Sequence, residues 1–247
     1  MFFERDKKWL LEEKYFGLES EAFFKDLERL KNGEPVDYLI GWKEFLGTKI
    51  DLSFKPLIPR EETEFWLYEY LFPELQKKKN EKKIILDIFA GSGCIGLGMK
   101  KNFQFFEVDF TDLKEENILQ IKKNLKLNNL KADVFQSDIF QNIPEKKYDF
   151  ILANPPYISK EKMSLIQDSV LKYEDEMFLF AEDDGLFFVK KLILEASKFL
   201  KKDGQLWIEY DDWQTEKIEK FLKDKNILNY SFLKDQFGKD RVVKIIF

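Results

Sequence analysis

Asn154-Pro155-Pro156-Tyr157 is the stretch of this sequence best suited to chemistry on a planar nitrogen. It follows an apolar run, residues 148–153, that has the character of a buried strand. The two prolines stiffen the backbone, and Pro155 biases Asn154 away from helix. The side-chain oxygen of Asn154 and the carbonyl oxygen of Pro155 can therefore accept from one NH2 group, with the Tyr157 ring against its flat face. The alternative is a double-proline turn that only closes a strand.

A glycine-rich turn, Gly91-Ser92-Gly93-Cys94-Ile95-Gly96, follows a second apolar run at residues 84–88. Glycines let the backbone approach a ligand closely, and a helix that begins near Cys94 would offer its N-terminus to anionic or polar groups. Asp87 lies at the end of the strand before the turn. The motif alone fits a dinucleotide-binding dehydrogenase equally well, and tight strand–helix packing would also explain its glycines.

Acidic residues after the next two expected strands extend this site. Asp112 follows a strand at residues 105–110 and is placed to bridge ribose hydroxyls. Asp138 follows a third strand and can accept from an adenine amino group, with Ile139 packing on the base. A helix cap or a turn is the alternative role for each aspartate. In open α/β sheets, ligands bind at the edge where these strands end.

The composition excludes several classes of protein. The chain of 247 residues contains no histidine, so histidine-based triads and histidine-ligated metals are excluded. Its single cysteine, Cys94, excludes internal disulfides and multi-cysteine zinc sites. The mixed charges, with a net of −5, argue against a main partner that is nucleic acid. No apolar run approaches a membrane span and the first residues do not resemble a signal peptide, so we expect no membrane association and a cytoplasmic location.

A nucleoside-sized cofactor beside an acceptor pair for NH2 indicates transfer of a group onto nitrogen. Methyl transfer from S-adenosylmethionine needs no metal and no strong base, because the sulfonium already provides a good leaving group. Positioning can contribute roughly 7–11 kcal/mol. Two carbonyl-type acceptors would align the lone pair of a poorly nucleophilic amide and stabilise the charge that forms on its nitrogen. This chemistry fits a chain without histidine.

The pattern of elements changes near residue 80. Before it, we expect two amphipathic helices within residues 6–32, a β-hairpin over 38–54 around Leu46-Gly47, and a helix that begins near Glu61. After it, strands and helices alternate, which indicates an α/β fold with a mostly parallel, doubly covered sheet. We expect a reduced helical N-terminal element at 1–34, a hairpin linker and helix at 35–80, and a catalytic domain at 81–247. The expected strands after residue 80 are 84–88, 105–110, 148–153, 205–210, 230–233 and 241–247, with a further strand that holds 134–135 and ends at 137–138. The expected helices begin near 94 or cover 115–127, about 186–200 and 216–222, and Lys202-Asp203-Gly204 is the expected turn before the strand at 205–210.

The residues from Asp87 to Gly93, with Asp112, Ser137-Asp138 and the proline loop, resemble class I (Rossmann-like) S-adenosylmethionine-dependent methyltransferases that act on planar nitrogens. Residues 33–41, 57–64, 173–174 and 241–243 narrow the resemblance to the release factor glutamine N5-methyltransferases (HemK/PrmC). The resemblance implies a seven-stranded sheet with an antiparallel last strand, and a helical element and hairpin before it.

That family methylates the side-chain amide of the glutamine in the Gly-Gly-Gln loop of peptide chain release factors and forms S-adenosylhomocysteine. By resemblance, the loop Phe89, Ala90, Gly91, Ser92, Gly93 binds the cofactor together with Asp112, and Ile139 lies near adenine. Asn154, Pro155, Pro156 and Tyr157 hold the glutamine. We expect a release factor as the partner and no stable nucleic-acid partner.

Departures from the family pattern keep alternatives open. Phe89 and Ala90 replace smaller residues and give a turn also found in nucleobase N-methyltransferases, which flip adenine or guanine of DNA or rRNA into the pocket. Glu61 and Asp175 stand where the family usually has proline. About thirty-odd residues precede the linker, so we expect the N-terminal domain to be reduced to a helix or two. A ribosomal-protein glutamine is a further possible substrate, and a scaffold that binds the cofactor without turnover is the non-enzyme alternative.

Overall fold

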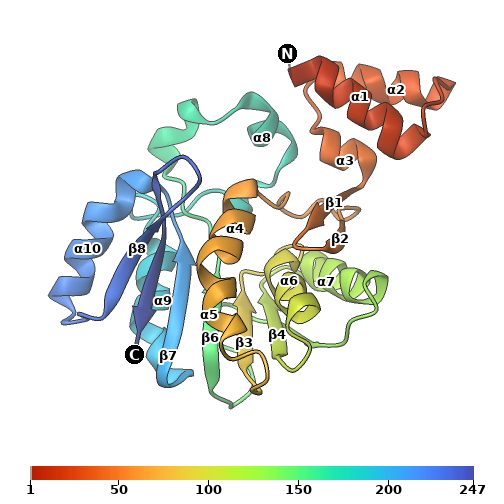
Figure 1. The fold of residues 1–247 in the computed structure, drawn as a ribbon. Coiled ribbons are helices and arrows are strands. Elements are labelled where there is room, and N and C mark those ends of the chain that lie inside the picture. Colours follow the sequence, from red (N-terminus) through yellow and green to blue (C-terminus); the bar gives the residue numbers. More distant parts are fainter. Residues whose placement is uncertain (1) are drawn as a thin grey trace.

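The chain forms one seven-stranded sheet covered by helices on both faces, in a computed structural model that describes residues 2–247 (Figure 1). The strand order is β5-β4-β3-β6-β7-β9-β8; β9 runs antiparallel to β7 and to β8, and the other neighbouring pairs in this sheet are parallel. This confirms the expected mostly parallel sheet with an antiparallel last strand. The strands are β3 (Ile84–Ile88), β4 (Glu107–Asp112), β5 (Asp133–Gln136), β6 (Tyr148–Ala153), β7 (Leu200–Glu209), β8 (Tyr230–Lys234) and β9 (Asp240–Ile246).

Alternating side chains of the central strands build two separate cores, as the two-residue period of a strand requires. On β3, Ile85 packs into one core, whereas Leu86 and Ile88 pack into the other. The first core also holds α6 (Cys94–Asn102), α7 (Glu115–Leu127) and the helical stretch made of α4 (Glu61–Trp66), a π-helical turn (Leu67–Leu71) and α5 (Phe72–Gln76). The second holds α9 (Phe187–Glu195) and α10 (Thr215–Asp224). Burial on both faces explains why apolar side chains predominate on both sides of β3 and β6.

The N-terminal helices gather apolar side chains of their own at one corner of the molecule (Figure 1). They are α1 (Phe2–Tyr15), α2 (Glu21–Lys31) and the short α3 (Val36–Ile40). The two expected helices are confirmed, and α1 begins earlier than expected. Seven of their side chains form a small cluster separate from the sheet: Leu10, Phe23, Leu27, Leu30, Val36, Leu39 and Ile40.

The hairpin is confirmed but is shorter than the expected 38–54. It consists of β1 (Trp42–Phe45) and β2 (Thr48–Asp51), which pair antiparallel around Leu46-Gly47. Both turn residues have positive φ, 47° and 74°, the backbone that a two-residue hairpin turn requires. Residues 36–40, just before β1, form the helix α3 instead of a strand. Gly41, in the left-handed conformation, ends this helix, so the hairpin can begin only at Trp42. The hairpin packs on α7, where the Asn124 side chain accepts from the Asp51 N–H (2.8 Å).

Two boundaries in the sheet domain differ from expectation. Strand β4 begins at Glu107, two residues later than expected, and reaches Asp112. Helix α9 ends at Glu195 and a single 3-10 turn follows, since Leu200 already pairs with Tyr148 as the start of β7. The expected turn at Lys202-Asp203-Gly204 is an irregularity inside β7, where the register with β6 shifts and Asp203 has a φ of 60°.

No helix within residues 2–247 is long and apolar enough to cross a lipid bilayer.

Candidate functional site

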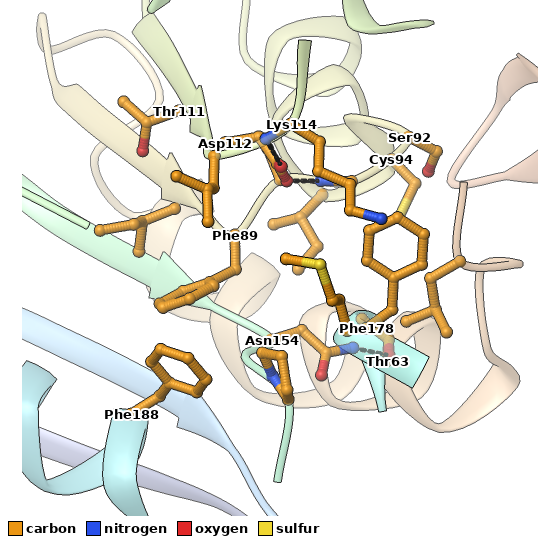
Figure 2. A pocket seen from close by; sticks show the side chains of 18 of the residues that line it. Thr63, Phe89, Ser92, Cys94, Thr111, Asp112, Lys114, Asn154, Phe178 and Phe188 are labelled. Carbon is orange, nitrogen blue, oxygen red and sulfur yellow. Dashed lines mark hydrogen bonds between the residues drawn. The ribbon is translucent and has the colours of Figure 1, made fainter. Parts of the chain in front are cut away.

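A cavity of about 950 Å³ of empty space, its open mouth included, lies at the carboxyl ends of β3, β4 and β6 (Figure 2). We call it the main cavity. The topology brings most of the expected cofactor residues to its wall, because the ends of neighbouring parallel strands meet at one edge. These residues are Phe89, Ala90, Gly91, Ser92, Asp112, Asp138, Ile139 and Asn154, and Pro156 joins them.

Two expected cofactor residues, Asp87 and Gly93, do not line the main cavity. Asp87 is fully buried beneath the glycine turn, where its Oδ2 accepts from the Gly96 N–H at 2.8 Å. Burial raises the pKa of Asp87 well above its ordinary value. A Cβ at Gly96 would meet the Phe110 ring at 2.3 Å, so this position requires glycine. Asp87 therefore supports the turn from below.

The Asp112 carboxylate ties the glycine turn to the end of β4. Its Oδ2 accepts from the Gly91 N–H (2.8 Å), and its Oδ1 accepts from the Lys114 N–H (2.9 Å) and from Asn117 Nδ2 (3.0 Å). Burial raises the pKa of Asp112, and these donors oppose that rise. The carboxylate still lines the main cavity, so it can both hold the turn and accept from a ligand.

The backbone is strained at two sides of the main cavity. Phe89 and Ile139 have φ values of 58° and 52°, a region that bulky and β-branched residues rarely adopt. The Phe89 ring packs edge-on against Phe188 of α9, with 5.1 Å between ring centroids. Such strain persists only where the surroundings impose it, and it concentrates at binding sites.

Cys94 lines the same cavity but offers no nucleophile. Burial raises the pKa of its thiol to about 12, so it stays protonated at neutral pH.

Asn154 is oriented by a chain of hydrogen bonds that begins on α4 (Figure 2). Its Nδ2 donates to Thr63 Oγ1 at 3.3 Å, and the Thr63 hydroxyl donates to Glu209 Oε2 at 2.7 Å. Because the amide nitrogen is engaged, Asn154 Oδ1 is left as an acceptor at the cavity wall. Asn154 lines both the main cavity and its neighbour.

Glu209, at the end of β7, anchors the chain of bonds from below. It is 1% exposed and also accepts from Trp66 Nε1 (2.9 Å) and from the Tyr157 hydroxyl (3.2 Å). Burial raises its pKa above the ordinary value, and the donors from Thr63 and Trp66 oppose the rise. One buried carboxyl therefore connects Tyr157 and Asn154, at the two ends of the proline loop.

Sequence reasoning missed Thr63, Trp66 and Glu209 as site residues. A signal for Glu209 was present, because a carboxylate inside the apolar run 206–210 must find partners when the strand is buried. Thr63 and Trp66 carried no local signal. They lie 146 and 143 residues from Glu209 along the chain.

A second, side cavity adjoins the first. The expected residues Pro155 and Tyr157 line it. Ile166 and Gln167, just before α8 (Asp168–Tyr173), and Val170 within that helix also line it. Four residues line both cavities and so form a shared wall: Leu57, Arg60, Asn154 and Phe178. A group that sits in the side cavity against Asn154 would therefore lie next to a ligand of the main cavity.

The back of the proline loop is clamped by the turn Asp183-Asp184-Gly185. A Cβ at Gly185 would come within 2.0 Å of the Tyr157 carbonyl oxygen, so only glycine allows this approach. Gln214 Nε2 donates to the Tyr157 and Asp184 carbonyls, both at 2.9 Å. The loop is therefore held from both sides, and its acceptors are set in place before a substrate arrives.

Comparison with known proteins agrees with this architecture. The Methyltransferase small domain family matches residues 69–175. A release factor glutamine methyltransferase from Streptococcus pneumoniae is 35% identical, over 92% of this chain and 80% of its own length. The one from Flavobacterium psychrophilum is 33% identical, over 90% and 78%. A Thermus thermophilus 16S rRNA N2 G1207 methyltransferase, solved with AdoMet and guanosine, shares the fold: the TM-score is 0.60, with 20% identity over 83% of this chain and 49% of that one.

Proposed function

Because the chain belongs to the release factor glutamine methyltransferase family, we propose that it methylates the side-chain amide of the glutamine in the Gly-Gly-Gln motif of peptide chain release factors. The methyl donor in this proposal is S-adenosylmethionine and the product is S-adenosylhomocysteine; the amide nitrogen would gain the methyl group and lose one proton to solvent. The observation that carries the proposal is the wall between the two cavities, where Asn154 lies against both the main cavity and the side cavity.

The residues of the main cavity fit this donor. Asp112 would accept from ribose hydroxyls, Asp138 would accept from the adenine amino group, and Ile139 would pack on the base. The glycine turn and the N-terminal end of α6 would hold the polar amino-acid portion, since free N–H groups at a helix start favour carboxylates. Asp87 and Gly93 would shape the turn without touching the ligand. When bound, S-adenosylmethionine supplies an activated methyl group on its sulfonium.

The side cavity would take the glutamine. Asn154 Oδ1 and the Pro155 carbonyl oxygen would accept from the two hydrogens of its amide. Pro156 and Tyr157 complete the loop that holds these two oxygens in place. An amide nitrogen is a weak nucleophile because its lone pair is delocalised. Two fixed acceptors orient the lone pair toward the main cavity and stabilise positive charge that develops on nitrogen, and such preorganised oxygens need no rearrangement during reaction.

Glu209 acts on this site from a distance. Thr63 lies between it and Asn154, so the carboxylate does not reach the substrate and is a positioning residue. Its bonds to Thr63 and Tyr157 fix both ends of the proline loop. Positioning of two reactants can contribute roughly 7–11 kcal/mol, the largest share expected in a site without a strong base.

The three segments of the chain take separate roles in the proposal. Residues 81–247 would hold the cofactor and the proline loop, and residues 35–80 supply Leu57 and Arg60 to the wall between the cavities. Residues 1–34 would contribute to docking of the release factor. We propose a cytoplasmic enzyme with a release factor as a transient partner and no stable nucleic-acid partner.

The test combines the protein with labelled S-adenosylmethionine and three candidate acceptors: a release factor, a ribosomal-protein preparation and a nucleic-acid preparation. We expect label on the release factor, at the glutamine of Gly-Gly-Gln by mass spectrometry. A release factor with this glutamine changed to alanine should stay unlabelled, and the Asn154→Ala enzyme is the matched control. Label on ribosomal protein or on nucleic acid alone would overturn the proposal.

A further inference from the structure

The segment from Glu174 to Phe178, just after α8, lies across the edge of the main cavity. Its last two residues, Met177 and Phe178, line that cavity, and Phe178 also belongs to the wall shared with the side cavity. The place of the Phe178 ring therefore affects both spaces. Only one turn of 3-10 helix, Glu176–Phe178, gives this segment regular structure, so contacts outside it must hold it in place.

Two ion pairs tie the segment to opposite sides of the cavity. Arg60 Nη2 donates to both carboxylate oxygens of Glu174, at 2.6 and 2.7 Å, and Glu174 is buried. On the other side, Lys114 Nζ pairs with Asp175. The first pair is an interior anchor. The second is more open to solvent, with side-chain exposures of 20% for Lys114 and 47% for Asp175.

Lys114 connects the end of β4, beside the main cavity, to the segment from Glu174 to Phe178, which we call the cover. Its backbone N–H donates to Asp112 Oδ1 at 2.9 Å, while its side chain reaches across the cavity. Figure 2 shows the Lys114 side chain pointing toward Phe178. The ammonium lies 4.5 Å from the centroid of the Phe178 ring. This is the distance of a cation–π contact. The hydrogen bond from Lys114 also lowers the pKa of Asp175, so this carboxyl is ionised at neutral pH.

We propose that Lys114 and Asp175 are positioning residues for the cofactor: their ion pair holds Phe178 over the main cavity and keeps a bound cofactor in place. The inference rests on the proposed function for the identity of the cofactor. It assigns a task to Asp175, which has no part in the proposed function. Glu174 fixes one end of the cover, and the Lys114–Asp175 pair closes the other.

A double-mutant cycle tests this pair, with S-adenosylmethionine affinity measured by calorimetry. Lys114→Gln and Asp175→Asn should each weaken binding about three- to tenfold, as an ion pair combined with a cation–π contact would suggest. The double variant should bind about as weakly as Lys114→Gln alone. Lys114→Arg keeps the charge and should stay within about twofold of wild type. Steady-state rates should show a higher KM for the cofactor with kcat within about twofold.

Two controls are the dependence of binding on ionic strength and the removal of an exposed ion pair far from the cavities. Raising ionic strength from about 50 to 500 mM should weaken wild-type binding toward that of the variants and should change the variants little. Lys223→Gln removes an exposed ion pair with Glu219 on α10 (2.8 Å), away from both cavities, and should leave cofactor affinity unchanged. Thermal unfolding of each variant checks that the fold is intact.

Three results would overturn the inference: cofactor affinity within twofold of wild type in Lys114→Gln, effects of the two single variants that simply add, or a loss confined to kcat. Because calorimetry needs no methyl acceptor, the outcome does not depend on which macromolecule is methylated. If no release factor is methylated but the cycle shows coupling, the proposed acceptor fails and the role of Lys114 and Asp175 stands.

Discussion

The main cavity and the side cavity are built by different means. Most of the main cavity is made by consecutive residues at strand ends, such as the turn from Phe89 to Ser92 and the pair Asp138-Ile139. The side cavity depends on the orientation of Asn154, which is set by Thr63 and Glu209 from distant parts of the chain. Changes in the first should therefore alter cofactor binding, whereas changes in the second should alter turnover and leave cofactor binding nearly intact.

The largest effect is expected at the acceptor. Asn154→Ala should lower methyl transfer by roughly 10²–10³-fold, because it removes a preorganised oxygen from the reacting nitrogen. Cofactor affinity by calorimetry should stay within several-fold of wild type. Wild-type turnover in this variant would rule out the role proposed for Asn154, and a loss of cofactor binding as large as the loss of turnover would erase the distinction between the cavities.

The opposite pattern is expected at Asp112. Asp112→Ala removes a ligand acceptor and also releases the Gly91 N–H, so cofactor affinity should fall about 10- to 100-fold. At saturating cofactor, kcat should stay within a few-fold of wild type. Calorimetry and initial rates at several cofactor concentrations would check both parts. An unchanged affinity would contradict the assignment of the main cavity.

A smaller effect on turnover is expected from Thr63→Val, which keeps the side-chain shape and removes the hydroxyl. Asn154 Nδ2 then loses its partner, so turnover should fall about tenfold with unchanged cofactor affinity. Thr48→Val is a matched control, since the buried Thr48 hydroxyl donates to the Phe45 carbonyl at 2.6 Å in the hairpin. Both variants should lose stability, and only Thr63→Val should lose activity. Equal turnover in the two would mean that Thr63 is merely structural.

The two cavities were not equally visible in the sequence. Local patterns sufficed for the strands, the glycine turn and the placement of Asp112 and Ile139, because each motif is short and follows a recognisable apolar run. The proline loop was also recognisable, since two prolines restrict the backbone whatever surrounds them. Short-range patterns therefore predicted the α/β sheet and most of the main cavity's wall.

The orientation of Asn154 could not be predicted in this way. It depends on Thr63 and Glu209, which only tertiary packing brings together. The supporting place of Asp87 beneath the turn was also missed, because the motif shows that the residue is near the turn but not which way its carboxylate points. The hairpin is shorter than expected because Gly41 ends the helix α3 directly before it. The end of α9 was placed too late because β7 begins already at Leu200, before the register shift with β6.

The smallest effect concerns pH and stability. Burial raises the pKa of Glu209 in the folded chain, so the folded state holds the proton more tightly than the unfolded state does. The free energy of unfolding should therefore fall as pH rises from roughly 4.3, the ordinary value for Glu, through the raised folded value. The fall should be about 1.4 kcal/mol for each tenfold difference in proton affinity between the two states. Glu209→Gln cannot titrate and should reduce this fall. Urea unfolding at several pH values would test it, and identical pH profiles would contradict the burial argument.

The placement of the glutamine amide beside Asn154 is best tested by a crystal structure of the protein with S-adenosylhomocysteine and a peptide that contains Gly-Gly-Gln. We expect the glutamine amide nitrogen in the side cavity, within about 2.7–3.2 Å of both Asn154 Oδ1 and the Pro155 carbonyl oxygen. We also expect the sulfur of the cofactor product on the other side of the wall formed by Asn154 and Phe178. A glutamine bound elsewhere, or an Asn154 whose oxygen turns toward Thr63, would contradict the proposed site.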